Sequence, residues 1–260
     1  DSLTFNPEFL REGTAVEDFF KPDRIVIGGN DSSKVQKLKD LYSDFEAEIL
    51  ITDPISSQLI KYLANTYLPL RLSFVNEAAR LVNSSGGNLD DVLKGVGMDS
   101  RIGQHYFRPS PAWGGSCFPK DVVEVNNFYD SEEVNLPLIA NIIESNKIQT
   151  QWTAKMLKSI HNEKKLSGII LVGAAFKEDT DDLRNSPTID IYNELKAENM
   201  NTMIYDDLIK SEEYLSIEDF ENLEEPHLIA LMYPVKEDLM SKINNIVSKS
   251  NSSLYTPWQL

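Results

Sequence analysis

Gly168-Ile-Ile-Leu-Val-Gly-Ala174 is the stretch that decides the fold. It is a short, partly β-branched apolar run that contains a closing glycine, which is typical of a buried strand. After it the pattern alternates, and it predicts a helix over 187–198, strands over 202–205 and 228–232, and a helix over 236–247. Strands that alternate with helices form parallel sheets. We therefore expect an α/β protein whose C-terminal part is a Rossmann-like, doubly wound parallel sheet.

Two long helical patterns precede this part of the chain. Apolar residues recur at every third or fourth position from Ile55 to about Val82, and again from Leu136 to about His161. Between them, residues 97–116 are rich in glycine and proline and are expected to form a structured loop. A short helix is predicted at 89–95, and another near Pro119, because proline suits a first helical turn.

The beginning of the chain resembles the end of a wound α/β domain. A strand is predicted over 24–29, a helix over 33–46 and a strand over 48–51. Because the chain opens with Asp1 inside this pattern, we expect it to be part of a longer protein. The expected divisions are a remnant of an N-terminal domain (1–53), a central helical region (54–135), a connecting helix (136–161) and a C-terminal domain (162–260).

Composition excludes several classes of protein. The 260 residues carry a formal net charge of −16, which argues against non-specific nucleic-acid binding. No apolar run reaches the length of a membrane span. A single cysteine excludes an internal disulfide framework, and the three histidines lack metal-ligand spacing, so no metal site is expected. A cytosolic setting is expected.

Cys117 is the first candidate for chemistry. It lies in Gly114-Gly-Ser-Cys-Phe-Pro-Lys-Asp121, at the predicted start of a helix and close to Lys120. A helix N-terminus and a nearby cation both favour the nucleophilic thiolate. The alternative is a buried structural cysteine, which the neighbouring glycines and charges disfavour.

Other candidates are weaker when the spacing is considered alone. Lys61 and Asn65 share a helix face and could stabilise an oxyanion, but an exposed polar pair is the better interpretation. Glu8 and Glu12 could act as bases, but acidic residues of a first helical turn explain them better. Phe176-Lys177, with charged residues to Arg184, follows a strand at the end where open α/β sheets bind ligands; a solvated loop is an equal alternative.

Taken together, these segments resemble the UDP-glucose/GDP-mannose dehydrogenase family. Seven stretches follow the family's order: Asn6–Gly13, Pro22–Gly28, Lys61–Asn65, Ser73–Glu77, Arg101–Gly103, Gly114–Asp121 and Gly173–Pro187. The resemblance implies oxidation of a sugar C6 alcohol to a carboxylate by two NAD molecules in turn, with UDP-glucose giving UDP-glucuronate. GDP-mannose or a UDP-N-acetylhexosamine is the alternative substrate, and a non-redox nucleotide-sugar binding and dimerisation module is an alternative of another class.

The resemblance also implies roles for individual residues. Cys117 matches the nucleophile that traps the aldehyde as a thiohemiacetal and then holds a thioester. Lys61 matches the lysine that stabilises the negative oxygen, with Asn65 beside it. Asp121 matches an aspartate that assists water or proton transfer, and Glu8 a glutamate of proton transfer and hydrolysis.

The remaining implied contacts belong to substrate, cofactor and partner. Arg101 is expected to reach the sugar site of the neighbouring subunit in a homodimer built on the central helix. NAD is expected near Glu12, Lys120 and Arg184. The UDP-sugar is expected to contact Phe9, Leu10, Arg101, Tyr106, Phe107, Arg108, Ser110, Gly114, Phe176 and Lys177.

The sequence departs from the family at several points. It contains no Gly-x-Gly-x-x-Gly turn, and the family's upstream threonine is absent. Ser110 and Ala112 stand where glycine is common, so Ala112 narrows the loop before the cysteine. We therefore expect the isolated chain to dimerise and bind a UDP-sugar but to oxidise it poorly or not at all.

Overall fold

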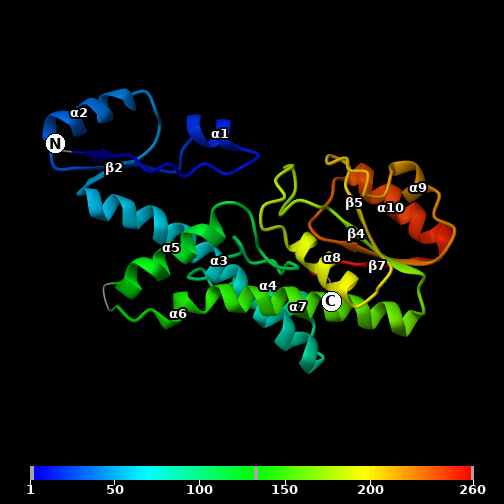
Figure 1. Cartoon of the computed structure of the whole chain (residues 1–260). Coiled ribbons are helices and arrows are strands. Elements are labelled where there is room, and N and C mark those ends of the chain that lie inside the picture. The colour runs from blue at the N-terminus through cyan, green and yellow to red at the C-terminus, as the bar shows by residue number, and fades with distance from the viewer. Residues whose placement is uncertain (1–2, 132–133, 259–260) are drawn as a thin grey trace. The chain divides into compact units, whose positions relative to one another are not determined.

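The computed structural model describes residues 3–131 and 134–258, which divide into two compact units, 1–67 and 68–260 (Figure 1). Each unit has its own sheet. In the first unit the strand order is β1 (Thr4–Phe5), β2 (Ile25–Gly29), β3 (Ile49–Thr52). In the second it is β5 (Thr202–Tyr205), β4 (Gly168–Val172), β6 (His227–Leu231), β7 (Ser253–Tyr255).

The first unit is built on strand β2 (Ile25–Gly29). Strand β1 (Thr4–Phe5) pairs with it antiparallel, and strand β3 (Ile49–Thr52) pairs with it parallel. Helix α2 (Ser32–Leu41) connects β2 to β3 and buries Val35 against Ile25 and Ile27. The predicted strand–helix–strand unit is confirmed, except that α2 ends at Leu41, because the chain turns after Tyr42.

Two elements of this unit were not predicted from the sequence. They are β1 and the short helix α1 (Ala15–Phe20). A strand of 2 residues and a helix of 6 residues are too short to show a hydrophobic period.

Helices make up the first half of the second unit. The long helix α3 (Pro54–Ser85) begins in the first unit and is followed by α4 (Leu89–Gly97) and α5 (Phe118–Ser131). The predicted helix over 136–161 is wrong in one respect, because α6 (Pro137–Ala140) and α7 (Ile142–Lys164) are separate helices. Asn141 lies at the break, and its amide donates to the carbonyl of Pro137 at 2.6 Å.

The predicted doubly wound sheet is confirmed in the second half of this unit. Strands β4 (Gly168–Val172), β5 (Thr202–Tyr205), β6 (His227–Leu231) and β7 (Ser253–Tyr255) are all parallel. The helices between them are α8 (Pro187–Ala197), α9 (Ile217–Glu221) and α10 (Glu237–Ser250). Strand β7 and helix α9 were not predicted, because both are short.

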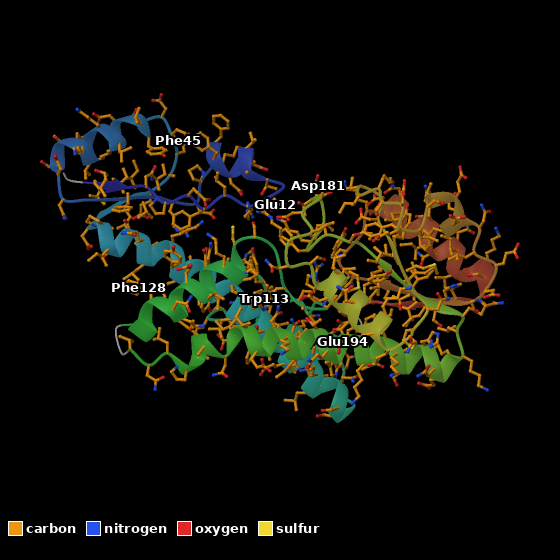
Figure 2. All side chains as sticks on the ribbon, viewed as in Figure 1. Glu12, Phe45, Trp113, Phe128, Asp181 and Glu194 are labelled. Atoms are coloured by element: carbon orange, nitrogen blue, oxygen red, sulfur yellow. The ribbon has the colours of Figure 1, made fainter. Side chains whose placement is uncertain are left out.

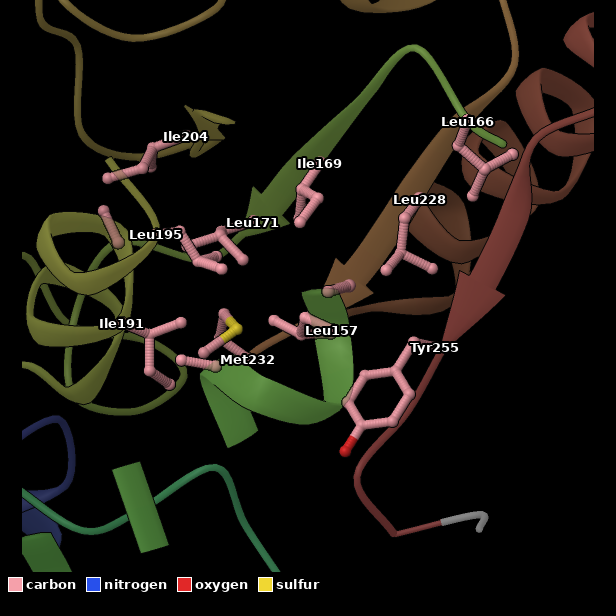
Figure 3. Close-up of a cluster of buried hydrophobic side chains, with 13 residues drawn as sticks. Leu157, Leu166, Ile169, Leu171, Ile191, Leu195, Ile204, Leu228, Met232 and Tyr255 are labelled. Atoms are coloured by element: carbon pink, nitrogen blue, oxygen red, sulfur yellow. The ribbon is translucent and has the colours of Figure 1, made fainter. Parts of the chain in front are cut away.

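The sheet is wound on both faces because alternate strand residues point to opposite sides. Ile169 and Leu171 of β4 pack with Leu157 of α7 and with α8 on one face (Figure 3). Ile170 and Val172 pack on the other face with α9 and α10. Both faces of β4 are therefore buried, which is the reason its sequence is a continuous apolar run rather than an alternating one.

Candidate active site

Glu8 and Lys61 form an ion pair in the first unit. The Lys61 Nζ lies 3.0 Å from Glu8 Oε1 and also donates to the Glu8 carbonyl at 2.6 Å. Only 19% of the lysine side chain is exposed, so Lys61 is not part of an exposed polar pair. Asn65, one turn further along α3, is half-buried. Glu8 lies in an irregular segment before α1, so the interpretation of it as a residue of a first helical turn is also wrong.

The segment around Glu8 is ordered by contacts within this unit. The backbone N–H of Leu10 donates to Glu8 Oε2 at 2.8 Å. The Arg24 guanidinium stacks on the Phe9 ring, 3.8 Å from its centroid, and Lys61 Nζ lies 5.5 Å from the same centroid. A partly enclosed ammonium group therefore lies beside an aromatic ring that already carries a stacked guanidinium.

Asp18 of α1 holds the segment that contains Arg11 and Thr14. The Arg11 guanidinium contacts its carboxylate at 2.5 Å, and the backbone N–H of Arg11 and the hydroxyl of Thr14 also donate to it. These hydrogen bonds, that of the Arg11 side chain first, outweigh burial and lower the pKa of Asp18 to about 2. Glu12, labelled in Figure 2, is half-buried in this segment. The residues that follow it line a cavity of about 540 Å³: Gly13, Thr14, Ala15, Val16, Glu17 and Phe20.

The N-termini of α2 and α3 do not fit the diphosphate of NAD. A dinucleotide diphosphate needs the free N–H groups of a helix N-terminus. Here the Asp31 carboxylate already accepts from the first N–H groups of α2, and the Asp53 carboxylate accepts from those of Ile55 and Ser56 at the start of α3. Hydrogen bonds from Ser56 are the main reason that the pKa of Asp53 is lowered, so this carboxylate stays charged. Both helix ends are thus occupied by anions of the chain itself.

In the second unit, Cys117 lies directly before α5, as the sequence predicted. Its side chain is exposed, so the interpretation as a buried structural cysteine is wrong. The carbonyl of Cys117 accepts from the backbone N–H of Asp121, while Ser116 Oγ lies 3.6 Å from the sulfur. Asp121 is buried, at 2% exposure, and pairs with Lys120 Nζ at 3.1 Å. The thiol is therefore accessible at a helix start with a carboxylate and an ammonium group one turn away.

Polar side chains, most of them buried, hold the loop that leads to this cysteine (residues 110–117, the cysteine loop). Asn146 of α7 accepts from the Trp113 N–H at 3.0 Å and donates to its carbonyl at 2.7 Å. The indole N–H of Trp113 donates to Ser73 of α3 at 3.0 Å. Trp113, labelled in Figure 2, packs among residues of α3, α5 and α7. Further bonds to the loop backbone come from Asn76, Gln149 and Thr153.

The other end of the cysteine loop is joined to the loop that follows β4 (residues 173–186, the strand-end loop). Gly115 donates its N–H to the Arg184 carbonyl at 3.1 Å, and its own carbonyl accepts from the Asn185 amide at 3.0 Å. A Cβ at Gly114 would lie 1.9 Å from the Asn185 carbonyl oxygen, and one at Gly115, with φ +92°, 2.8 Å from the Phe176 ring. Only glycine allows this approach. Two motifs far apart in the sequence are thereby brought together.

The strand-end loop carries the predicted nucleotide contacts. Lys177 and Phe176 are half-buried, with the ammonium 5.6 Å from the ring centroid. Arg184 is exposed and forms a two-point ion pair with Asp182, with contacts of 2.7–3.0 Å. Ser186 Oγ donates to the Ala174 carbonyl at 2.6 Å and closes the loop. This loop is therefore ordered rather than merely solvated.

The residues predicted to contact substrate near 101–110 differ in exposure. Arg101 is 87% exposed and pairs with Asp99 at 2.6 Å, which raises the pKa of the guanidinium. Tyr106 is exposed and has a positive φ of 52°, whereas Phe107 is buried. Arg108 lies over the Trp258 ring, 5.5 Å from its centroid, and Ser110 is held by its backbone bonds.

Sequence reasoning missed Asp206, at the carboxyl end of β5. This buried carboxylate accepts from the N–H groups of Ala174, Leu208 and Ile209 and from the Tyr233 hydroxyl at 3.1 Å. Burial and the Asp206 charge raise the pKa of Tyr233. The sequence signal that could have indicated Asp206 is its position directly after the predicted strand at 202–205. Among the described residues there is no cluster of His, Cys, Asp or Glu that could hold a metal, and no helix is long and apolar enough to cross a membrane.

Three models of one family match this chain. The UDP-glucose/GDP-mannose dehydrogenase family's NAD binding domain matches residues 2–46, its central domain residues 55–148 and its UDP binding domain residues 170–243. The chain is 38% identical over 235 residues to a UDP-glucose 6-dehydrogenase of Rickettsia felis, covering 88% of this chain and 51% of that protein. It is 39% identical over 219 residues to UDP-glucose 6-dehydrogenase 3 of Arabidopsis thaliana, covering 80% of this chain and 45% of that protein.

Solved structures agree with these matches. A UDP-glucose dehydrogenase from Pyrobaculum islandicum superimposes with a TM-score of 0.79 at 32% identity, over 89% of this chain and 56% of that one. A UDP-D-ManNAc dehydrogenase from Pyrococcus horikoshii gives a TM-score of 0.83 at 21% identity, over 99% of this chain and 61% of that one, and shares the fold. The chain spans about half the length of the curated relatives it matches. It belongs to the UDP-glucose/GDP-mannose dehydrogenase family.

Proposed function

We propose that this chain supplies the nucleotide-sugar site and the reactive thiol for the NAD-dependent oxidation of UDP-glucose to UDP-glucuronate. The observation that carries the proposal is an accessible Cys117 at a helix start, in a loop fastened to the strand-end loop. The curated relatives named UDP-glucose 6-dehydrogenase favour UDP-glucose over GDP-mannose or an N-acetylated sugar.

When bound, NAD would supply the two oxidations, and the remaining steps fall to the chain's own residues. At the aldehyde level, the Cys117 sulfur bonds to sugar C6 as the carbon–oxygen π bond breaks, and the thiol proton passes to the oxygen, which becomes the hydroxyl of a thiohemiacetal. At the acid level, water adds to the thioester carbon and the carbon–sulfur bond breaks, which gives a carboxylate, the free thiol and one released proton. In each addition negative charge develops on one oxygen.

Three charged side chains are proposed to serve these steps. Lys61 stabilises the developing oxyanion, and its low exposure strengthens the interaction. Asp121 accepts or returns the proton of the attacking water, and its burial close to the thiol suits this role. Glu8 holds Lys61 in place through the ion pair and takes part in proton transfer.

Recognition of the nucleotide is assigned to the strand-end loop and the cysteine loop. A chain with a net charge of −16 must bind a diphosphate through local cations and backbone N–H groups rather than through its overall field. We assign the UDP-sugar contacts to Phe176 and Lys177 with Gly114 of the cysteine loop. Arg184, whose guanidinium is exposed, is assigned to NAD.

A second candidate is a nucleotide-sugar binding module without redox activity. The capped N-termini of α2 and α3 favour it for this chain in isolation. Titration calorimetry with UDP-glucose, GDP-mannose and UDP-N-acetylglucosamine tests binding. The chain is then mixed with NAD and UDP-glucose, and a rise in NADH absorbance reports oxidation. Binding of UDP-glucose above the other two supports the substrate assignment, and binding of none of them contradicts both candidates.

A homodimer through the central helices is part of the proposal. Phe74 and Leu81 lie seven residues apart on one face of α3 and are 58% and 67% exposed. Phe128 of α5 is 58% exposed and Leu138 of α6 is 65% exposed. A contiguous exposed apolar surface is typical of an interface, and Phe74 with Leu81 supplies an apolar stripe on α3 for one. Sedimentation should give twice the mass of the chain, and Leu81→Glu should shift it toward the monomer; a wild-type monomer at high concentration would contradict the dimer.

A further inference from the structure

Asn185 has an unusual conformation at the junction of the two loops. Its φ is +50°, in the left-handed region that asparagine tolerates better than most residues. From there its side-chain amide donates to the Gly115 carbonyl at 3.0 Å, while its own carbonyl oxygen faces the space beside Gly114. This hydrogen bond links the strand-end loop to the backbone two residues before Cys117.

The two loops differ in how they are otherwise held. The first part of the cysteine loop is anchored to α3 and α7 through Asn76 and Asn146. Gly115, closer to the thiol, is bonded instead to residues 184 and 185 of the strand-end loop. A change in the strand-end loop therefore reaches the cysteine through Asn185 and the neighbouring Arg184 carbonyl.

We propose that Asn185 is a positioning residue that transmits occupancy of the strand-end loop by a uridine diphosphate to the placement of Cys117. The inference rests on the proposed function, because it takes the strand-end loop to be the nucleotide site. When the nucleotide occupies this loop, the amide of Asn185 holds Gly115 and limits the excursions of the thiol. Without the amide, nucleotide binding and thiol placement become independent.

The single cysteine makes the test direct, because any alkylation of the chain's thiol occurs at Cys117. The probe is the rate of alkylation by iodoacetamide, measured by intact mass with and without saturating UDP. Asn185→Gly removes the amide, and glycine accepts the positive φ without strain. Asn185→Asp keeps the shape but places a carboxylate, which cannot donate, against the Gly115 carbonyl. Asn199→Gly is the matched control, because Asn199 also has a positive φ, at the far end of α8.

In the wild-type chain and in Asn199→Gly, UDP should slow alkylation by about three- to tenfold, the effect of one hydrogen bond. In both Asn185 variants this difference should vanish, while calorimetry shows UDP still bound within about threefold of the wild-type affinity. Protection that persists in Asn185→Gly would overturn the inference, since UDP would then shield the thiol directly. An absent UDP effect in the wild-type chain despite calorimetric binding would also overturn it. Absence of UDP binding to the wild-type chain would instead contradict the proposed function.

Discussion

Substitution of Gly114 by alanine tests the junction of the two loops most severely. The added Cβ would lie 1.9 Å from the Asn185 carbonyl oxygen and 3.0 Å from Pro187 Cδ. Carbon and oxygen atoms that are not bonded stay about 3.5 Å apart, and a backbone oxygen cannot rotate away. The loops must therefore separate by more than an ångström.

Separation of the cysteine loop from the strand-end loop lowers the stability of the second unit. It breaks the bond from the Gly115 N–H to Arg184 and the bond from the Asn185 amide to Gly115, each of which contributes about 1 kcal/mol. Repacking of the loops adds about 1 kcal/mol or more. We expect Gly114→Ala to lower the free energy of unfolding of the second unit by about 3 kcal/mol, or its melting temperature by roughly 6–12 °C.

Tryptophan fluorescence in urea measures the free energy of unfolding of the second unit, because that unit contains Trp113, Trp152 and Trp258. Gly95→Ala is the control: a Cβ there meets nothing within 4 Å, and alanine in a helix is about 0.5–1 kcal/mol more stable than glycine. The two substitutions should thus have opposite signs. A Gly114→Ala midpoint equal to or above that of the wild type would refute the close approach of the loops.

Three further predictions concern other parts of the chain. Asp18→Asn should destabilise the first unit by about 2 kcal/mol at most near neutral pH, because the folded pKa of about 2 lies below the ordinary 3.8. The difference in stability between wild type and variant, followed by circular dichroism, should persist above pH 4 and shrink as the pH falls toward 2. A pH-independent difference would contradict this ion pair. Thr153→Val should lower the free energy of unfolding by about 1–2 kcal/mol in the urea assay, because it leaves the Pro111 carbonyl without its buried donor. Thr150→Val is the control and should lower it by less, because the half-buried Thr150 hydroxyl bonds within its own helix. Equal effects would contradict the role of Thr153. The chain alone should give no measurable NADH from UDP-glucose, because carboxylates of the chain cap the N-termini of α2 and α3, and a clear rate would contradict this expectation.

The fold of the C-terminal part could be predicted because its strands are buried on both faces. The run at 168–174 is continuously apolar for this reason, and β5 was predicted with its observed bounds. The helix at 136–161 was predicted as one element because its apolar period continues through Asn141, where a side-chain bond to the Pro137 carbonyl accompanies the break. Short elements such as β1 and α9 carry no period from which they could be predicted.

The candidate site could be predicted only in part. The residue types around Cys117 indicated an accessible thiol at a helix start, and the structure has both features. Spacing alone suggested that Lys61 was exposed, because the helical pattern cannot show that Glu8, far away in the sequence, covers it. The same limit applies to Asn146 and Asn185, whose hydrogen bonds to loop backbone depend on contacts between distant segments.

In the proposed function, the Cys117 sulfur bonds to the oxidised C6 carbon of the sugar. It is tested most directly by the C6 aldehyde of UDP-glucose, which needs no oxidation before the thiol can add to it. Iodoacetamide should alkylate Cys117 much more slowly in the presence of this aldehyde than in the presence of UDP-glucose at equal occupancy. Equal alkylation rates with the aldehyde and the alcohol, both bound, would contradict the covalent role of the thiol.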